Sequence, residues 1–76
     1  MGYDDIVKNI NEGKIYMVIG KCYNHKAGQE SIDKKILCRR VRKDLKVDNR
    51  NVVDRNNKRV RRFRIYEFSE EEIVVC

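Results

Sequence analysis

The feature that most constrains the fold is a continuous run of five apolar residues, Ile15-Tyr-Met-Val-Ile19. Gly13 precedes this run and Gly20 follows it directly. A short apolar run bounded by glycines is typical of a strand that is buried on both faces. We therefore expect residues 14–20 to form the central strand of a sheet.

The segment before this strand predicts a short helix over residues 3–12. An aspartate near its start would cap the free amide groups and complement the positive helix end. Gly13 is a plausible stop, because glycine tolerates the left-handed conformation that ends many helices. Four apolar residues recur at the i, i+3, i+4 and i+7 spacing that stacks side chains on one helix face: Tyr3, Ile6, Val7 and Ile10.

The rest of the chain alternates between polar connections and strand-like segments. Residues 22–34 are polar and predict a loop or a ragged hairpin. Residues 44–57 are also polar and predict a mobile connection or a long hairpin tip. Residues 35–43 predict a strand in which apolar residues and arginines share both faces, so at least one arginine stem must pack near the apolar side. Residues 59–68 predict a strand with imperfect alternation: Phe63 and Ile65 point one way and Arg62, Arg64 and Tyr66 the other, with a bulge expected after them. The β-branched residues 73–75 predict a last short strand.

This order predicts a single α+β domain over residues 1–76. Its short N-terminal helix would pack on a small, mostly antiparallel sheet of about four strands, or on a partly open barrel. A chain of 76 residues without tryptophan is near the size where one core is barely sufficient. A homodimer would supply additional buried apolar area.

The sequence also indicates the cellular compartment of the protein. It contains no run of the ~20 apolar residues that a membrane helix needs, so we expect no membrane association. The acidic first 15 residues lack the order of a signal peptide. Three cysteines, an odd number, fit reduced thiols better than a disulfide framework. We therefore expect a cytoplasmic protein.

Charge is strongly segregated along the chain. Residues 34–64 hold fourteen Lys and Arg against three Asp, a net charge of +11, whereas residues 1–33 carry −1 and residues 65–76 carry −4. Dense positive charge releases counterions from nucleic-acid backbones, and arginine adds forked hydrogen bonds to phosphate. We therefore expect a non-enzymatic module that binds DNA or RNA mainly through the phosphate backbone. Tyr66, with Phe68 on the same strand face, would stack on unpaired bases. The predicted binding residues are Arg39, Arg40, Arg42, Lys43, Arg59, Arg61, Arg62, Arg64 and Tyr66.

A second interpretation is a protein-docking inhibitor or regulator. Glu67 and Glu70–Glu72 lie close to the arginines in sequence and would neutralise part of their charge. Such a two-signed surface steers protein partners together. The abundance of Asn, Lys and Ile fits a small phage or virus genome, and the partner would then be a host enzyme.

Two further residue patterns are too incomplete to form a metal site or a catalytic site. Cys22 and His25, with Cys38, supply part of a tetrahedral zinc site, but the second pair of ligands is missing. The same Cys22 and His25 lack a third residue that would orient a nucleophile and its base. We therefore expect no metal, no cofactor and no catalytic residue.

Overall fold

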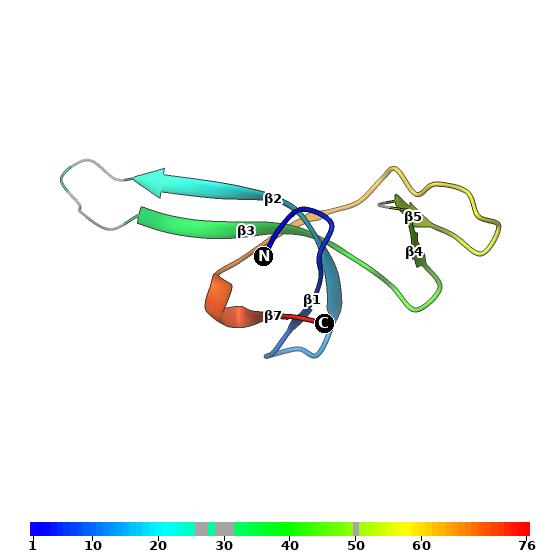
Figure 1. The fold of residues 1–76 in the computed structure, drawn as a ribbon, viewed down its shortest axis with the longest axis horizontal. Coiled ribbons are helices and arrows are strands. Elements are labelled where there is room, and N and C mark those ends of the chain that lie inside the picture. The colour runs from blue at the N-terminus through cyan, green and yellow to red at the C-terminus, as the bar shows by residue number, and fades with distance from the viewer. Residues whose placement is uncertain (26–27, 29–31, 50) are drawn as a thin grey trace.

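The chain folds into two antiparallel sheets (Figure 1). It leaves the main sheet, forms the second sheet and then returns to the main sheet. The computed structural model describes residues 1–25, 28, 32–49 and 51–76, with residues 24, 25, 32 and 33 described by their backbone alone. The main sheet has the strand order β6-β3-β2-β1-β7, and the second sheet pairs β4 with β5. The elements in chain order are β1 (Ile6–Asn9), β2 (Ile15–His25), β3 (Ile32–Arg40), β4 (Lys46–Asp48), β5 (Asn51–Val53), β6 (Ile65–Phe68), the 3-10 turn η1 (Glu70–Glu72) and β7 (Ile73–Val75).

The predicted N-terminal helix over residues 3–12 is wrong, and with it the α+β class. Within this segment Ile6–Asn9 form β1, which pairs with β2 on one side and β7 on the other. Asp4 has a φ of 67°, outside the right-handed helical range. The Asn9 side-chain oxygen accepts hydrogen bonds from the amides of Asn11 and Glu12, at 2.9 Å each. It closes a turn in which Gly13 adopts the expected positive φ, but between two strands.

The central strand is confirmed and runs further than expected. β2 is the third of five strands, and Tyr16, Met17 and Val18 on both of its faces are buried. It continues through Gly20 to His25, so the glycine does not end it. The register against β3 shifts between Val18 and Gly20, and β2 is visibly bent along its length in Figure 1. The bend carries β1 and β7 around beneath the hairpin formed by β2 and β3.

The polar segment 22–34 is largely part of this β2–β3 hairpin. Its first residues extend β2 and its last residues extend β3, from Cys22↔Lys35 to His25↔Ile32. Residues 26–27 and 29–31 lie outside the described residues. The strand predicted over 35–43 is shifted, because β3 starts earlier and ends at Arg40.

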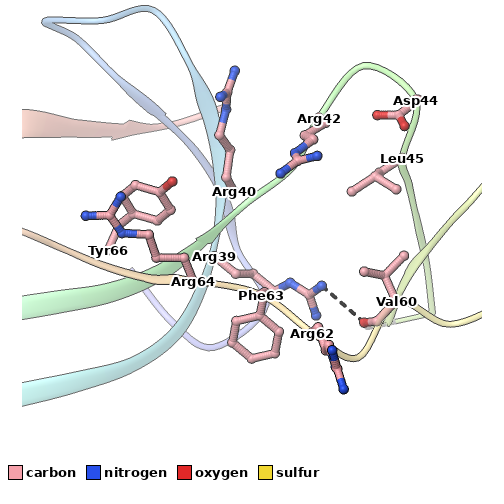
Figure 2. A pocket seen from close by; sticks show the side chains of 10 residues that line it. All are labelled: Arg39, Arg40, Arg42, Asp44, Leu45, Val60, Arg62, Phe63, Arg64 and Tyr66. Carbon is pink, nitrogen blue, oxygen red and sulfur yellow. Dashed lines mark hydrogen bonds between the residues drawn. The ribbon is translucent and has the colours of Figure 1, made fainter.

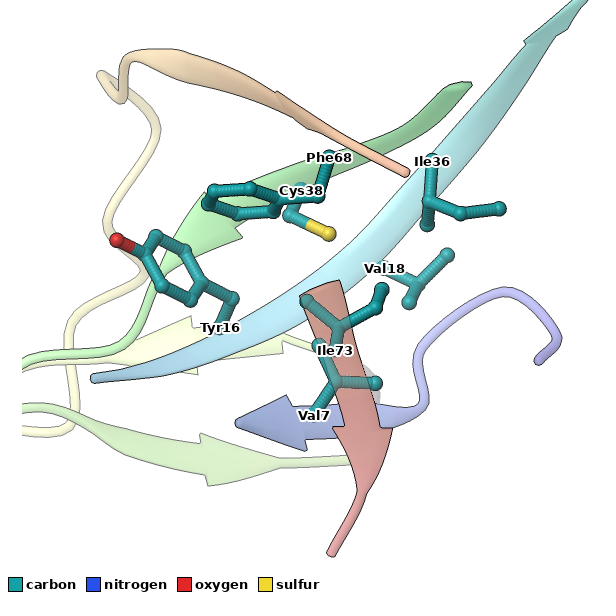
Figure 3. Close-up of a cluster of buried hydrophobic side chains, with 7 residues drawn as sticks. All are labelled: Val7, Tyr16, Val18, Ile36, Cys38, Phe68 and Ile73. Carbon is teal, nitrogen blue, oxygen red and sulfur yellow. The ribbon is translucent and has the colours of Figure 1, made fainter. Parts of the chain in front are cut away.

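The core lies on one face of the main sheet (Figure 3). Tyr16 meets Phe68 edge-to-face with ring centroids 4.8 Å apart, an arrangement that aromatic pairs favour. Strands far apart in sequence contribute to the cluster, which consists of Val7, Tyr16, Val18, Ile36, Cys38, Phe68 and Ile73. Because this face includes Phe68, the ring expected to stack on bases lies in the core instead.

The predicted strand over 59–68 is only half formed as a strand. β6 pairs with β3 from Arg39↔Ile65 to Ile36↔Phe68 without a bulge, whereas residues 60–64 lie outside the ladder. The strand predicted over 73–75 is confirmed as β7. η1 carries the chain from β6 at one edge of the sheet to β7 at the other.

The second sheet sits beyond the end of β3 in Figure 1. It occupies the connection predicted as a hairpin tip, of which Arg50 lies outside the described residues. Val52 and Val53 are buried there, and the Val60 amide donates to the Val52 carbonyl at 2.8 Å as the chain returns. The molecule measures 51 × 23 × 18 Å. Among the described residues, no helix is long and apolar enough to cross a membrane.

Candidate functional site

The site forms where two stretches of chain pass each other at the end of β3. The outgoing stretch, residues 40–45, turns away from the sheet and is closed by a hydrogen bond from the Leu45 amide to the Arg42 carbonyl at 3.0 Å. The returning stretch, residues 60–64, leads back into β6. Both stretches are rich in arginine, so the fold brings together residues that are about twenty positions apart in the sequence.

Two adjoining hollows lie at this crossing. The first hollow, of about 200 Å³, is lined by Arg39, Arg40, Arg42, Asp44, Leu45, Val60, Arg62, Phe63, Arg64 and Tyr66 (Figure 2). The second hollow, of about 290 Å³, is lined by Arg39, Arg59, Val60, Arg61 and Phe63. Eight of the nine predicted binding residues therefore line one hollow or the other; Lys43 is exposed and lines neither. We call the seven arginines of the two hollows the arginine site.

Arg39 holds the returning stretch in place. Its Nη2 donates to the Val60 carbonyl at 3.1 Å, drawn as a dashed line in Figure 2, and its guanidinium lies 4.1 Å from the centroid of the Phe63 ring. The residue is only 7 % exposed, so its charge is nearly buried. Burial lowers the pKa of Arg39 from its ordinary value, and repulsion from Arg59 lowers this pKa further. By alternation along β3, Arg39 lies on the face opposite the core residues Ile36 and Cys38, so its burial comes from the returning stretch and not from the main core.

Tyr66 is less available than the sequence indicates. It is half-buried, meets Tyr16 edge-to-face at 5.2 Å, and carries the Arg64 guanidinium 5.1 Å from its ring centroid. Figure 2 shows Arg64 lying across this ring. Tyr66 therefore anchors the returning stretch to the core and supports Arg64.

Phe63 is the aromatic residue that the sequence does not single out. Alternation along the strand places it with Ile65, which suggests a core-facing side chain. In the structure it is 45 % exposed and lines both hollows, whereas Phe68 is 8 % exposed. The adjacent arginines are the available sequence signal, because an exposed ring beside cations is a common feature of nucleic-acid-binding grooves.

Two of the acidic residues near the C-terminus, Glu70 and Glu72, have other partners. Glu70 pairs with Lys34 at 2.5 Å, and this contact lowers the pKa of Glu70. Glu72 accepts hydrogen bonds from the Ser69 amide and hydroxyl, which cap η1 and lower the pKa of Glu72. Within the described part of the chain, no ion pair joins an arginine of the site to a carboxylate.

The partial zinc pattern is dispersed. Cys38 lies fully buried in the core, where burial raises its pKa to about 11, so its thiolate form is disfavoured. Cys22 is half-buried on the neighbouring strand, and the side chain of His25 lies outside the described residues. Among the residues whose side chains are described, no group of three potential ligands is close enough to hold a metal.

Comparison with known proteins adds no relative from which a role could be transferred. No protein-family model, curated protein or solved structure matches the chain.

Proposed function

We propose that this chain is a non-enzymatic module that binds nucleic acid through the phosphate backbone, with the arginine site as its contact surface. The observation that carries the proposal is the convergence of seven arginines on two adjoining hollows, with no ion pair to a carboxylate among the described residues. Unpaired arginines at a concave surface attract polyanions and bind phosphate oxygens in a forked geometry. The free thiols support a reducing compartment, so we place this function in the cytoplasm.

The test replaces two exposed arginines of the returning stretch, Arg62→Ala with Arg64→Ala. Removing one phosphate contact should reduce the slope of log affinity against log salt by about 0.7 to 0.9. The double variant should therefore weaken binding to all sequences alike and flatten the slope by roughly 1.4 to 1.8. Fluorescence anisotropy of short DNA and RNA oligonucleotides over a salt series measures both quantities.

A matched control removes the same charge elsewhere. Lys46→Ala with Arg55→Ala changes two exposed residues that line neither hollow. This control should retain the wild-type slope if the hollows are the contact surface. If both double variants flatten the slope equally, binding is diffuse and the arginine site is not its location. If the wild type binds no oligonucleotide even at low salt, where attraction is strongest, the proposal fails.

One observation favours the second interpretation, docking to a protein partner. β7 is an edge strand, and its Val74 and Val75 side chains are 49 % and 55 % exposed. An exposed edge with apolar side chains is a template onto which a partner protein adds a strand. Pull-down from nuclease-treated and untreated lysate separates the two functions. Recovery of one host protein after nuclease treatment, abolished by Val74→Lys, would favour docking through β7.

A further inference from the structure

Phe63 presents one covered and one open side. The guanidinium of Arg39 lies over the ring at 4.1 Å, yet 45 % of the residue remains exposed. The ring is fixed by this contact and by the neighbouring hydrogen bond from Arg39 to Val60. A fixed, exposed aromatic ring is a surface on which a planar group can stack with little loss of side-chain entropy.

Beside this ring is positive charge that has no paired carboxylate among the described residues. Arg39 is more than nine-tenths buried, and its Nε has no hydrogen-bond partner within the described part of the chain. A buried guanidinium is normally paired, because an unpaired buried charge is costly. Instead, the nearby charge on Arg59 repels it. An anion bound between the two guanidinium groups would offset this repulsion.

The second hollow contains both features. Arg39, Arg59 and Phe63 line it together, with Arg61 at the same wall, and its volume of about 290 Å³ is close to the lower limit of small-ligand pockets, ~300 Å³. It therefore has room for a compact ligand that combines a negative group with a flat apolar one.

We propose that the second hollow binds one nucleotide of a single strand, with its phosphate between Arg39 and Arg59 and its base stacked on the open side of Phe63. This inference rests on the proposed function and specifies its ligand as single-stranded nucleic acid. A base in a duplex is already stacked and paired, so only an unpaired base can cover Phe63. The module should therefore prefer single strands to a duplex of the same sequence.

The base contact is tested with Phe63→Leu. Binding of three probes is measured at one salt concentration: a short oligothymidylate, an abasic strand of equal length and a duplex. Removing the stacking surface for one base should weaken oligothymidylate binding by about 5- to 150-fold, with the other two probes unchanged. Phe63→Tyr should restore binding, because it keeps the ring. Tyr23→Leu is the control, since Tyr23 is also exposed beside a cation, Lys34, but lines neither hollow.

The phosphate contact is tested separately with Arg59→Gln. This change should reduce the salt slope for the oligothymidylate and the abasic strand by about 0.7, whereas Phe63→Leu should leave both slopes unchanged. Arg59→Lys should keep the slope, and Arg55→Gln, outside both hollows, should behave as wild type.

The outcomes separate this inference from the proposed function. Equal wild-type affinity for all three probes, or a Phe63→Leu loss shared by all three, would overturn the nucleotide site while leaving phosphate-backbone binding intact. A wild type that binds none of the probes at low salt would overturn both. Thermal unfolding of each variant is recorded alongside. If Phe63→Leu is unfolded, the other two variants decide. Weaker oligothymidylate binding by Phe63→Tyr contradicts the inference. An unchanged salt slope for Arg59→Gln contradicts it as well.

Discussion

At the scale of single residues, the arginines divide into two roles that the sequence does not distinguish. Arg39 is buried and positions Val60 and Phe63, whereas Arg59, Arg61, Arg62 and Arg64 are exposed. The charge pattern predicts most members of the site because most charged side chains lie near solvent. It does not predict their roles, because burial of one residue on β3 depends on a stretch of chain that returns about twenty residues later.

The environment of Cys38 gives a prediction about thiol chemistry. Its side chain is fully buried and its pKa is raised to about 11, so at pH 8 only about one thiol in a thousand is ionised in the folded protein. Iodoacetamide should label the exposed Cys76 quickly and Cys22 more slowly, and Cys38 only after denaturant is added. Peptide mass spectrometry measures the three rates. Labelling of native Cys38 as fast as Cys76 would show that the core does not protect it.

At the scale of elements, strands built on compact apolar runs are predictable and the N-terminal segment is not. The runs that form β7 and the first half of β2 are apolar or β-branched and lie between polar or turn-forming residues, so local sequence and tertiary contacts agree. Residues 3–12 match a helical spacing, but ten residues are too few to form a stable helix alone. Pairing with β2 and β7 decides the outcome, and Tyr3 and Ile10 are left exposed at 71 % and 55 %. The asparagines at 9 and 11 are the signals that favour a turn.

The docking of β7 gives a prediction at this scale. Ile73 is 3 % exposed and joins the core, whereas the next residue, Val74, is 49 % exposed on the other face. Ile73→Ala should lower the free energy of unfolding by about 2–5 kcal/mol, because it removes packed methyl groups and leaves a cavity. Val74→Ala should change it by less than about 0.5 kcal/mol. Urea unfolding measures both. Equal effects would mean that β7 does not pack as the structure shows.

At the scale of the whole molecule, segregated sequence charge becomes one charged region between the two sheets. The two arginine-rich stretches meet at one end of β3. Lys34, which lies on the same strand five residues before Arg39, pairs instead with Glu70 of η1. The returning stretch could be predicted as basic and extended, but its position beside residues 40–45 depends on the small sheet of β4 and β5 between them. The charge pattern of the sequence carries no information about that detour.

The crowded arginines predict an unusual dependence of stability on salt. Like charges held together in the folded state repel one another, and salt screens this repulsion with a Debye length of ~10 Å at 0.1 M. The folded protein should therefore become more stable as NaCl is added, although surface pairs such as Lys34 with Glu70 weaken slightly. Each kcal/mol gained should raise Tm by about 4–8 °C for a chain of this size. Differential scanning fluorimetry over a salt series at constant pH measures the rise.

The variants identify which charges are responsible. Arg62→Ala with Arg64→Ala should reduce the rise in Tm between low and high salt, whereas Lys46→Ala with Arg55→Ala, which removes equal charge outside the hollows, should reduce it less. The change with salt is compared rather than Tm itself, because removing the Arg64 guanidinium from the Tyr66 ring also lowers stability. A wild-type Tm that falls with NaCl would mean that carboxylates already neutralise the arginines in solution. The arginine site would then have no free positive charge to offer a phosphate backbone.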